Sequence, residues 1–192
     1  VGLLLGLNRE ASEDACKTKA MRLGAAEGRA GDAMVQYEQV LAKEPENLDA
    51  LEFMFKRYHL GGSSRSGPAF ARLLETLAAK DFDRAAIVVR EHFPRYFAFV
   101  PVDLLARLGF HSYRCGDLVL ARHCLERAAE AEGPWQPKTL LMLAQTFEAI
   151  ENSSMARRTL EAVARRFPGT LFAEEAHQKL AELGVLQGGA SG

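Results

Sequence analysis

One pattern of apolar and small residues occurs twice in this chain, about 35 residues apart. In the first copy the pattern consists of Leu105, Leu108, Gly109, Tyr113, Gly116, Ala121, Leu125 and Ala128. In the second copy it consists of Leu140, Leu143, Ala144, Phe147, Ala156, Leu160, Val163 and Pro168. A period near 34 residues with a small residue midway is typical of a repeated helix-turn-helix unit, whose apolar face only a neighbouring unit can cover. The pattern therefore predicts a stack of helix pairs, and such chains usually bind other proteins rather than catalyse reactions.

The second copy has the features of an antiparallel helix pair. Apolar residues recur at three- and four-residue spacing across 137–150, which places them on one face of a helix. The polar run 152–154 interrupts that helix, and either of its serines is suited to cap the next one. Pro168 ends the second helix. Ala121 and Ala156 fall where the two helices of each pair would cross, and a larger side chain there would force the backbones apart.

The two copies resemble the tetratricopeptide repeat family, whose pattern runs from a large apolar residue through Leu-Gly and Tyr to Ala, Phe or Tyr, and Pro. Segments 102–135 and 137–170 match this pattern well. Segments 14–47 and 66–99 match it more loosely, because the first lacks the usual aromatic residue and the second fits only with a one-residue shift. The resemblance implies an all-α fold in which antiparallel helix pairs stack as a right-handed α-solenoid of about ten helices.

The spacing of the matching alanines predicts an irregular place in the stack. Ala33 and Ala85 are separated by 52 residues, more than one repeat, so we expect an extra helix at 47–60, followed by a flexible glycine-rich connection. A final helix at 170–184 directs charges outward, as the end of a stack requires. The predicted organisation is an apolar stub and linker at 1–10, a repeat domain at 11–184 and a disordered tail at 185–192.

Composition supports a helical protein and argues against nucleic-acid binding. The chain has 192 residues, of which 48% are hydrophobic and 26% charged, and it lacks the alternating Val- and Ile-rich runs of a sheet protein. Its net charge is -1, and the basic pairs at 157–158 and 165–166 are balanced by nearby glutamates. We therefore expect protein or peptide partners and no nucleic acid.

The first seven residues, VGLLLGL, are wholly apolar. A bilayer span needs about 20 apolar residues, so this segment cannot cross a membrane alone. It is either an apolar first turn that packs on the first repeat or the end of a transmembrane helix whose remainder lies outside this sequence. In the second case, nearby basic residues favour the cytoplasmic side, namely Arg9, Lys17, Lys19 and Arg22. The odd number of three cysteines also favours a reducing compartment. The expected location is the cytoplasmic face of a bacterial membrane, or otherwise the cytoplasm.

This order of segments resembles the soluble C-terminal region of bacterial rhomboid-family membrane proteins. Rhomboids cleave peptide bonds within the membrane, using a serine in a Gly-x-Ser-Gly motif and a histidine on another transmembrane helix. The motif is spelled by 189–192, but it lies in a polar tail with no apolar helix to hold it, so we interpret it as coincidence. The resemblance implies an alternative function, that of a regulatory or substrate-recruiting domain of an intramembrane protease whose catalytic residues lie outside this chain.

Four potential zinc ligands occur close together in the sequence, namely His111, Cys115, His123 and Cys124. Structural zinc sites favour two ligands that are two to four residues apart in each half. The adjacent His123 and Cys124 would point about 100 degrees apart on a helix, so core cysteines and surface histidines explain the group more simply. The chain also lacks a GxxxxGK phosphate loop and an HExxH motif. We predict no metal, no cofactor and no catalytic activity in this chain.

Function is therefore expected on a surface. In tetratricopeptide-like arrays the first helix of each pair lines a concave groove, so the resemblance implies a groove that binds a peptide or a partner protein. The residues predicted to line it are Phe70, Leu74, Asp103, Phe110, Tyr113, Arg114, Lys138, Leu141, Gln145 and Glu148. Phe110, Tyr113 and Arg114 are the candidate anchors, because aromatic and arginine side chains dominate interface energetics. Alternatively, Phe110 and Tyr113 fill the seam between two repeats.

Overall fold

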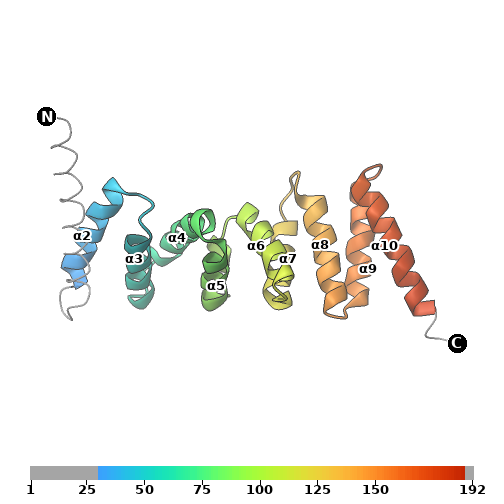
Figure 1. Cartoon of the computed structure of the whole chain (residues 1–192), viewed down its shortest axis with the longest axis horizontal. Coiled ribbons are helices and arrows are strands. Elements are labelled where there is room, and N and C mark those ends of the chain that lie inside the picture. The colour runs from blue at the N-terminus through green and yellow to red at the C-terminus, as the bar shows by residue number, and fades with distance from the viewer. Residues whose placement is uncertain (1–29, 189–192) are drawn as a thin grey trace. The chain divides into compact units, whose positions relative to one another are not determined.

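The computed structural model describes residues 30–188, and within that range it contains α-helices, one short 3-10 helix and no β-strand (Figure 1). The elements are α2 (Ala30–Lys43), α3 (Leu48–Leu60), α4 (Ser66–Lys80), α5 (Phe82–His92), η1 (Phe97–Phe99), α6 (Val102–Arg114), α7 (Leu118–Ala129), α8 (Gln136–Ala149), α9 (Ser153–Arg166) and α10 (Leu171–Gly188). The predicted all-α class is confirmed for these residues.

Two ends of the predicted organisation fall outside the described residues. The apolar stub Val1–Leu7, Cys16 and the motif at 189–192 all lie there. At the carboxyl end, α10 continues to Gly188, so residues 185–188 of the predicted tail belong to a helix.

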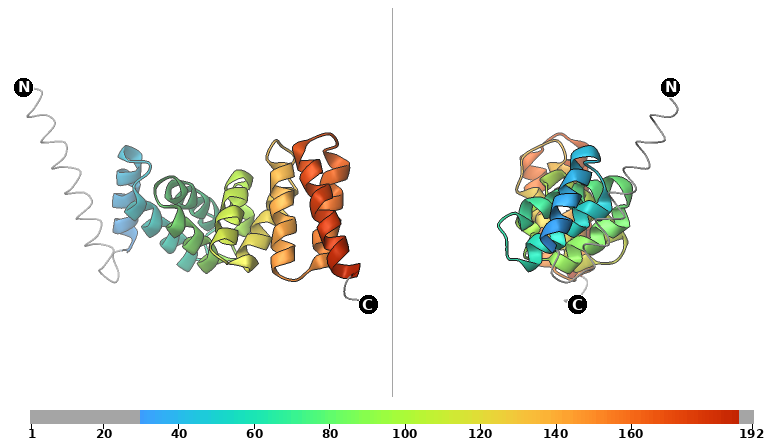
Figure 2. Two further views of the ribbon diagram at one scale, coloured as in Figure 1. Left: turned by 45° about the vertical axis from the view of Figure 1, so that its right-hand side comes forward. Right: turned by 90° about the vertical axis from the view of Figure 1, so that its left-hand side faces the viewer.

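The chain divides into two compact units, Val1–Phe99 and Val100–Gly192. In the first unit, α3 contacts both α2 and α4, and α4 contacts α5 and η1. In the second unit each helix from α6 to α10 contacts the next, and α8 also contacts α6 and α10. Figure 2 shows α8, α9 and α10 side by side in the second unit. Each unit is therefore built from helices that are neighbours in sequence, as the repeat pattern predicted.

The starts of the helices follow one period of about 35 residues. One series of helices begins at residues 30, 66, 102, 136 and 171, and the other begins at 48, 82, 118 and 153. The helix predicted at 47–60 is present as α3, and its role as an extra helix stays a prediction because residues before Ala30 lie outside the described part. Ala33 of α2 and Ala85 of α5 are both fully buried.

Four helices, α3, α5, α7 and α9, each bury their fourth and eighth residues. These pairs are Leu51 and Phe55 in α3, Ala85 and Val89 in α5, Ala121 and Leu125 in α7, and Ala156 and Leu160 in α9. The two alanines predicted at helix crossings, Ala121 and Ala156, are both fully buried. Small side chains at these places let the helices of a pair approach closely.

The same four helices, α3, α5, α7 and α9, also share one kind of N-cap. The carboxyl or amide oxygens of Asn47, Asp81, Asp117 and Asn152 each accept a hydrogen bond from a backbone N–H three residues later. Such caps satisfy backbone donors that have no partner inside the helix. The cap of α9 is therefore Asn152, and the prediction of a serine cap at 153 or 154 was wrong by one or two residues.

The glycine-rich connection between α3 and α4 is a hydrogen-bonded turn. Gly62 has a positive φ of 62°, and the N–H of Ser63 donates to the carbonyl of Tyr58, as in a Schellman motif. The Ser66 hydroxyl donates to the Ser63 carbonyl at 2.7 Å, and α4 begins at Ser66 itself. The flexibility expected of this connection stays a prediction.

Candidate interaction surfaces

Three of the ten residues predicted to line a groove are buried. Phe70 is 1% exposed and Leu74 is 0% exposed, so both belong to the core of the first unit. Phe70 stacks on Tyr96 with ring centroids 5.2 Å apart. Leu141 is 4% exposed and belongs to an apolar cluster with Leu160 and other residues of α8, α9 and α10. These side chains cannot meet a partner directly, because neighbouring helices cover the faces on which they lie.

The remaining predicted residues reach the surface of the second unit. Asp103, Arg114 and Lys138 are exposed, whereas Phe110, Tyr113, Gln145 and Glu148 are partly buried. We define the α6–α8 surface as the residues of this set that lie on α8 or on the second half of α6, namely Phe110, Tyr113, Arg114, Lys138, Gln145 and Glu148.

Phe110 connects α6 with α8 through two kinds of contact. One part of its side chain packs against the buried cluster that contains Leu125, Leu143 and Phe147. Its ring also lies under the ammonium group of Lys138, whose nitrogen is 5.4 Å from the ring centroid. A cation–π contact of this kind contributes about 0.5–1 kcal/mol at an exposed site. Phe110 thus fills part of the seam between helices and still presents part of its ring at the surface.

The four potential zinc ligands separate into two pairs. The sulfur of Cys115 lies 3.5 Å from the Nε2 atom of His111, and this cysteine is exposed, so the core position predicted for it was wrong. Cys124 is buried, and burial raises the pKa of its thiol to about 12, with a smaller contribution from the negative charge of Asp117. A thiol that stays protonated is a poor metal ligand. Within 30–188 no three His, Cys, Asp or Glu side chains are grouped as a metal site would require.

An aromatic and histidine cluster forms the centre of the first unit. The Phe55 ring contacts Phe70 and Tyr96, with centroids 5.3 and 5.4 Å apart. The Nδ1 atom of His59 is 2.7 Å from the Tyr96 hydroxyl. Burial lowers the pKa of His92, and the nearby imidazole of His59 lowers it further. The cluster joins α3, α4 and the segment after α5, and it gives the first unit a core of its own.

A pocket of about 490 Å³ opens between α2, α3 and α4 of the first unit. It is lined by Glu38, Leu41, Ala42, Leu51, Met54, Tyr58, Arg65, Pro68, Ala69 and Arg72. None of these residues was among the predicted groove residues. The sequence does contain one sign of this pocket. Arg65, the N-cap residue of α4, and Arg72 are seven residues apart and so lie on one side of that helix.

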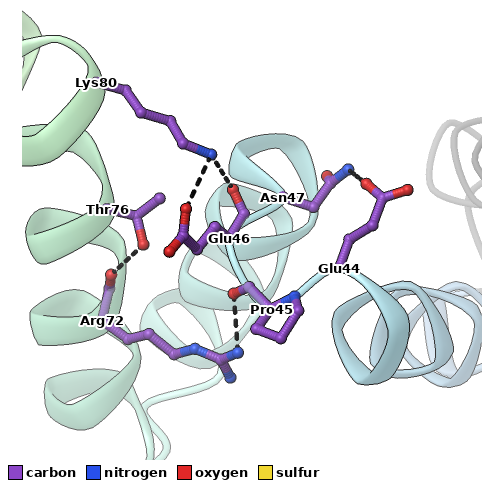
Figure 3. Close-up of polar contacts among 7 residues, drawn as sticks. All are labelled: Glu44, Pro45, Glu46, Asn47, Arg72, Thr76 and Lys80. Carbon is purple, nitrogen blue, oxygen red and sulfur yellow. Dashed lines mark hydrogen bonds and ion pairs between the residues drawn. The ribbon is translucent and has the colours of Figure 1, made fainter.

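Polar contacts from α4 fix the turn between α2 and α3 beside this pocket (Figure 3). A guanidinium nitrogen of Arg72 donates to the Pro45 carbonyl at 2.8 Å. The Lys80 ammonium donates to the Glu46 carbonyl at 2.9 Å and lies 3.5 Å from the Glu46 carboxylate. Within the turn, the Asn47 amide donates to the Glu44 carboxylate at 2.7 Å. These contacts place the Arg72 side chain at the edge of the pocket.

Comparisons with known proteins find similar solved structures, but no matching family model and no matching curated protein. The crystal structure of MamA protein is 19% identical over 87% of this chain and 94% of its own, with a TM-score of 0.37. A Podosopora anserina putative kinesin light chain with nearly identical TPR-like repeats is 14% identical over 93% of this chain and 86% of its own, with a TM-score of 0.41. At such identities and scores, no residue role is transferred to this chain.

Two further predictions concern the membrane. None of the helices within 30–188 has the length and apolar character needed to cross a bilayer. The resemblance to rhomboid-family proteins stays a prediction from the sequence. The membrane anchor depends on residues before Ala30, outside the described part, and stays a prediction.

Proposed function

We propose that this chain is a protein-interaction module that binds a peptide or a partner protein on its α6–α8 surface. The observation that carries the proposal is the contact between Lys138 and the Phe110 ring. This contact brings an aromatic side chain from α6 and a charged side chain from α8 to one place. Tyr113 and Arg114 follow Phe110 on the same helix, so aromatic and cationic groups are combined as in many binding sites for proteins.

The proposed mode of binding follows from how firmly these side chains are held. Phe110 is anchored by the apolar cluster beneath it, so its ring loses little freedom when a partner covers it. Glu148 and Gln145 on α8 supply hydrogen-bonding groups at the edge of the surface. An apolar side chain of a partner would cover the exposed part of the Phe110 and Tyr113 rings. The polar groups around them would then set its orientation.

The test begins with selection of binders from a displayed library of random peptides, followed by affinity measurement with purified protein. In the variant with both Phe110→Ala and Tyr113→Ala, we expect affinity for the selected peptides to fall at least about tenfold, because truncating interface anchors commonly costs 1 kcal/mol or more. Val119 and Leu171 of the same unit are exposed apolar residues outside this surface, so Val119→Ala with Leu171→Ala is the matched control. Circular dichroism confirms that both variants are folded. Equal affinities of the two double variants would contradict the proposal.

A further inference from the structure

We propose that the pocket between α2, α3 and α4 is a second binding site, which takes a peptide segment that carries a large apolar side chain flanked by carboxylates. This site adds to the function proposed above. It lies in the first unit, and its existence does not depend on the α6–α8 surface of the second unit.

The inner surface of the pocket is apolar. Leu51 and Met54 of α3 are buried beneath it, and Leu41, Pro68 and Ala69 line its sides. Its volume of about 490 Å³ lies within the range of ~300–1,000 Å³ that is common for ligand sites. Water in such a place is favourably replaced by an apolar group. The pocket therefore suits a large aliphatic or aromatic side chain.

Two arginines add a positive charge to one side of the pocket. Arg65 and Arg72 are exposed, and the apolar residues Pro68 and Ala69 lie between them on α4. Seven residues of a helix correspond to a separation of roughly 10 Å along its axis. Of the acidic side chains that the structure describes, none pairs with either arginine. The Arg65 guanidinium, and the N–H groups of Arg72 that do not bond the Pro45 carbonyl, are thus available to a carboxylate, with which arginine forms paired hydrogen bonds.

The start of α4 is also favourable for an anion. Its first turn contains no acidic residue. The positive end of the helix dipole therefore adds to the charge of Arg65. The hydrogen bond from Arg72 to the Pro45 carbonyl holds the second guanidinium in place at the other end of the pocket.

The opposite wall gives the ligand a direction. Glu38 lines the pocket from α2, whereas Arg72 lines it from α4, so a carboxylate placed against α2 would be repelled. A bound segment should therefore direct its carboxylates toward α4 and its apolar side chain toward α3. A small inorganic anion would use the arginines alone and leave the apolar surface uncovered, so the combined chemistry favours an acidic, apolar peptide.

The test uses four short synthetic peptides with a fluorescent label and the full chain as receptor. The first carries a central Leu-Phe pair flanked by glutamates, two others replace the glutamates by glutamine or lysine, and the fourth replaces Leu-Phe by Ala-Ala. We expect saturable fluorescence anisotropy for the glutamate peptide and binding at least about tenfold weaker for the glutamine peptide. The lysine and Ala-Ala peptides should not saturate. Binding of the glutamate peptide should also weaken as salt is added.

Two pairs of variants locate the binding. Arg65→Glu should lower affinity for the glutamate peptide at least about tenfold, and it keeps the helix because an acidic residue is favourable at a helix start. Its matched control is Arg57→Glu, an exposed position of α3 outside the pocket. Ala69→Trp should block the pocket, whereas Ala79→Trp, on an exposed position of the same helix, should leave binding unchanged.

Failure of this proposal is distinguishable from failure of the proposed function. Absence of saturable binding by the glutamate peptide, or binding that Arg65→Glu and Ala69→Trp do not weaken, overturns the pocket proposal. If that same binding is lost in the Phe110→Ala and Tyr113→Ala double variant, the chain is an interaction module but the pocket is not its site. The proposed function itself fails only when peptides selected from the random library show no dependence on the α6–α8 surface.

Discussion

Glu151 has a left-handed backbone conformation, with a φ of 60°, in the turn between α8 and α9. The equivalent turn between α6 and α7 has Gly116 at the same place, with a φ of 78°. In both turns the N–H of the following residue donates to a carbonyl five residues earlier, from Asn152 to Phe147 and from Asp117 to Ser112. A residue with a Cβ atom costs roughly 1–2 kcal/mol in this conformation, whereas glycine does not. One turn therefore contains strain that its counterpart lacks.

Replacing Glu151 by glycine should raise the free energy of unfolding by about 0.5–1 kcal/mol. The relief of the strained backbone outweighs the greater freedom that glycine has in the unfolded chain. The change is measured by urea unfolding followed by circular dichroism. Glu151→Ala is the control, because it removes the same side chain but keeps the Cβ atom, and it should give no gain. A glycine variant no more stable than the alanine variant would show that this turn is unstrained.

The crossing of α6 and α7 depends on the absence of a side chain at Gly109. A Cβ atom there would lie 2.6 Å from the Cγ atom of Leu125 and 2.7 Å from its Cδ2 atom. Leu125 is fully buried in the cluster that also contains Phe147, so it has little room to move. Gly184 of α10 differs, because a Cβ atom there would meet nothing within 4 Å. Substitution of Gly109 by alanine therefore tests close packing together with helix propensity, whereas substitution of Gly184 tests helix propensity alone.

Gly109→Ala should lower the free energy of unfolding by about 1–2 kcal/mol. Overpacking costs roughly 1–3 kcal/mol, and the better helix propensity of alanine returns at most about 1 kcal/mol of it. In contrast, Gly184→Ala should be neutral or stabilising by up to about 1 kcal/mol, because only propensity changes. Chemical unfolding of both variants under the same conditions measures the two changes in the free energy of unfolding. Equal effects would mean that α6 and α7 do not cross closely at this glycine.

The helix pairs that carry a full repeat pattern could be located from the sequence. The predicted pairs at 102–135 and 137–170 correspond to α6 with α7 and to α8 with α9. In the first unit, where the pattern is incomplete, the helix predicted at 47–60 corresponds to α3. The recurring Asn and Asp caps, which begin with Asn47 and Asp81, mark the starts of α3 and α5 and are a signal that the apolar pattern alone did not use.

The candidate sites were less predictable than the helices. In a repeat array, neighbouring helices cover more than one face of the first helix of each pair. The helical spacing of apolar residues therefore shows which residues share a face, but not whether another helix buries that face. Phe70 and Leu141 were therefore predicted at a surface, but the structure buries both. The pocket beside Arg65 and Arg72 was missed because it depends on how α2, α3 and α4 pack together. That packing follows from the pairing of the helices and from no single motif.

At the scale of the whole molecule, each unit has a separate apolar core. In the first unit Phe55, Phe70 and Tyr96 pack together. In the second unit one buried cluster centres on Leu160 and Val163, and another includes Leu125 and Ala156. Most contacts within each unit join helices that are close in sequence. In repeat proteins such local contacts allow stability to be approximately a sum over neighbouring units.

The fragment 100–192 should therefore fold without the first unit. We expect a helical circular dichroism spectrum and a single urea transition with a slope of about 1–3 kcal/mol/M, as for other small domains. The control is Ala156→Asp in the same fragment, which places a charge at a fully buried position and should abolish the transition. A fragment that lacks a cooperative transition would show that the buried clusters of α6 to α10 are insufficient alone. In that case the free energy of folding of this half depends on residues before Val100, and stability is not a sum over the two units.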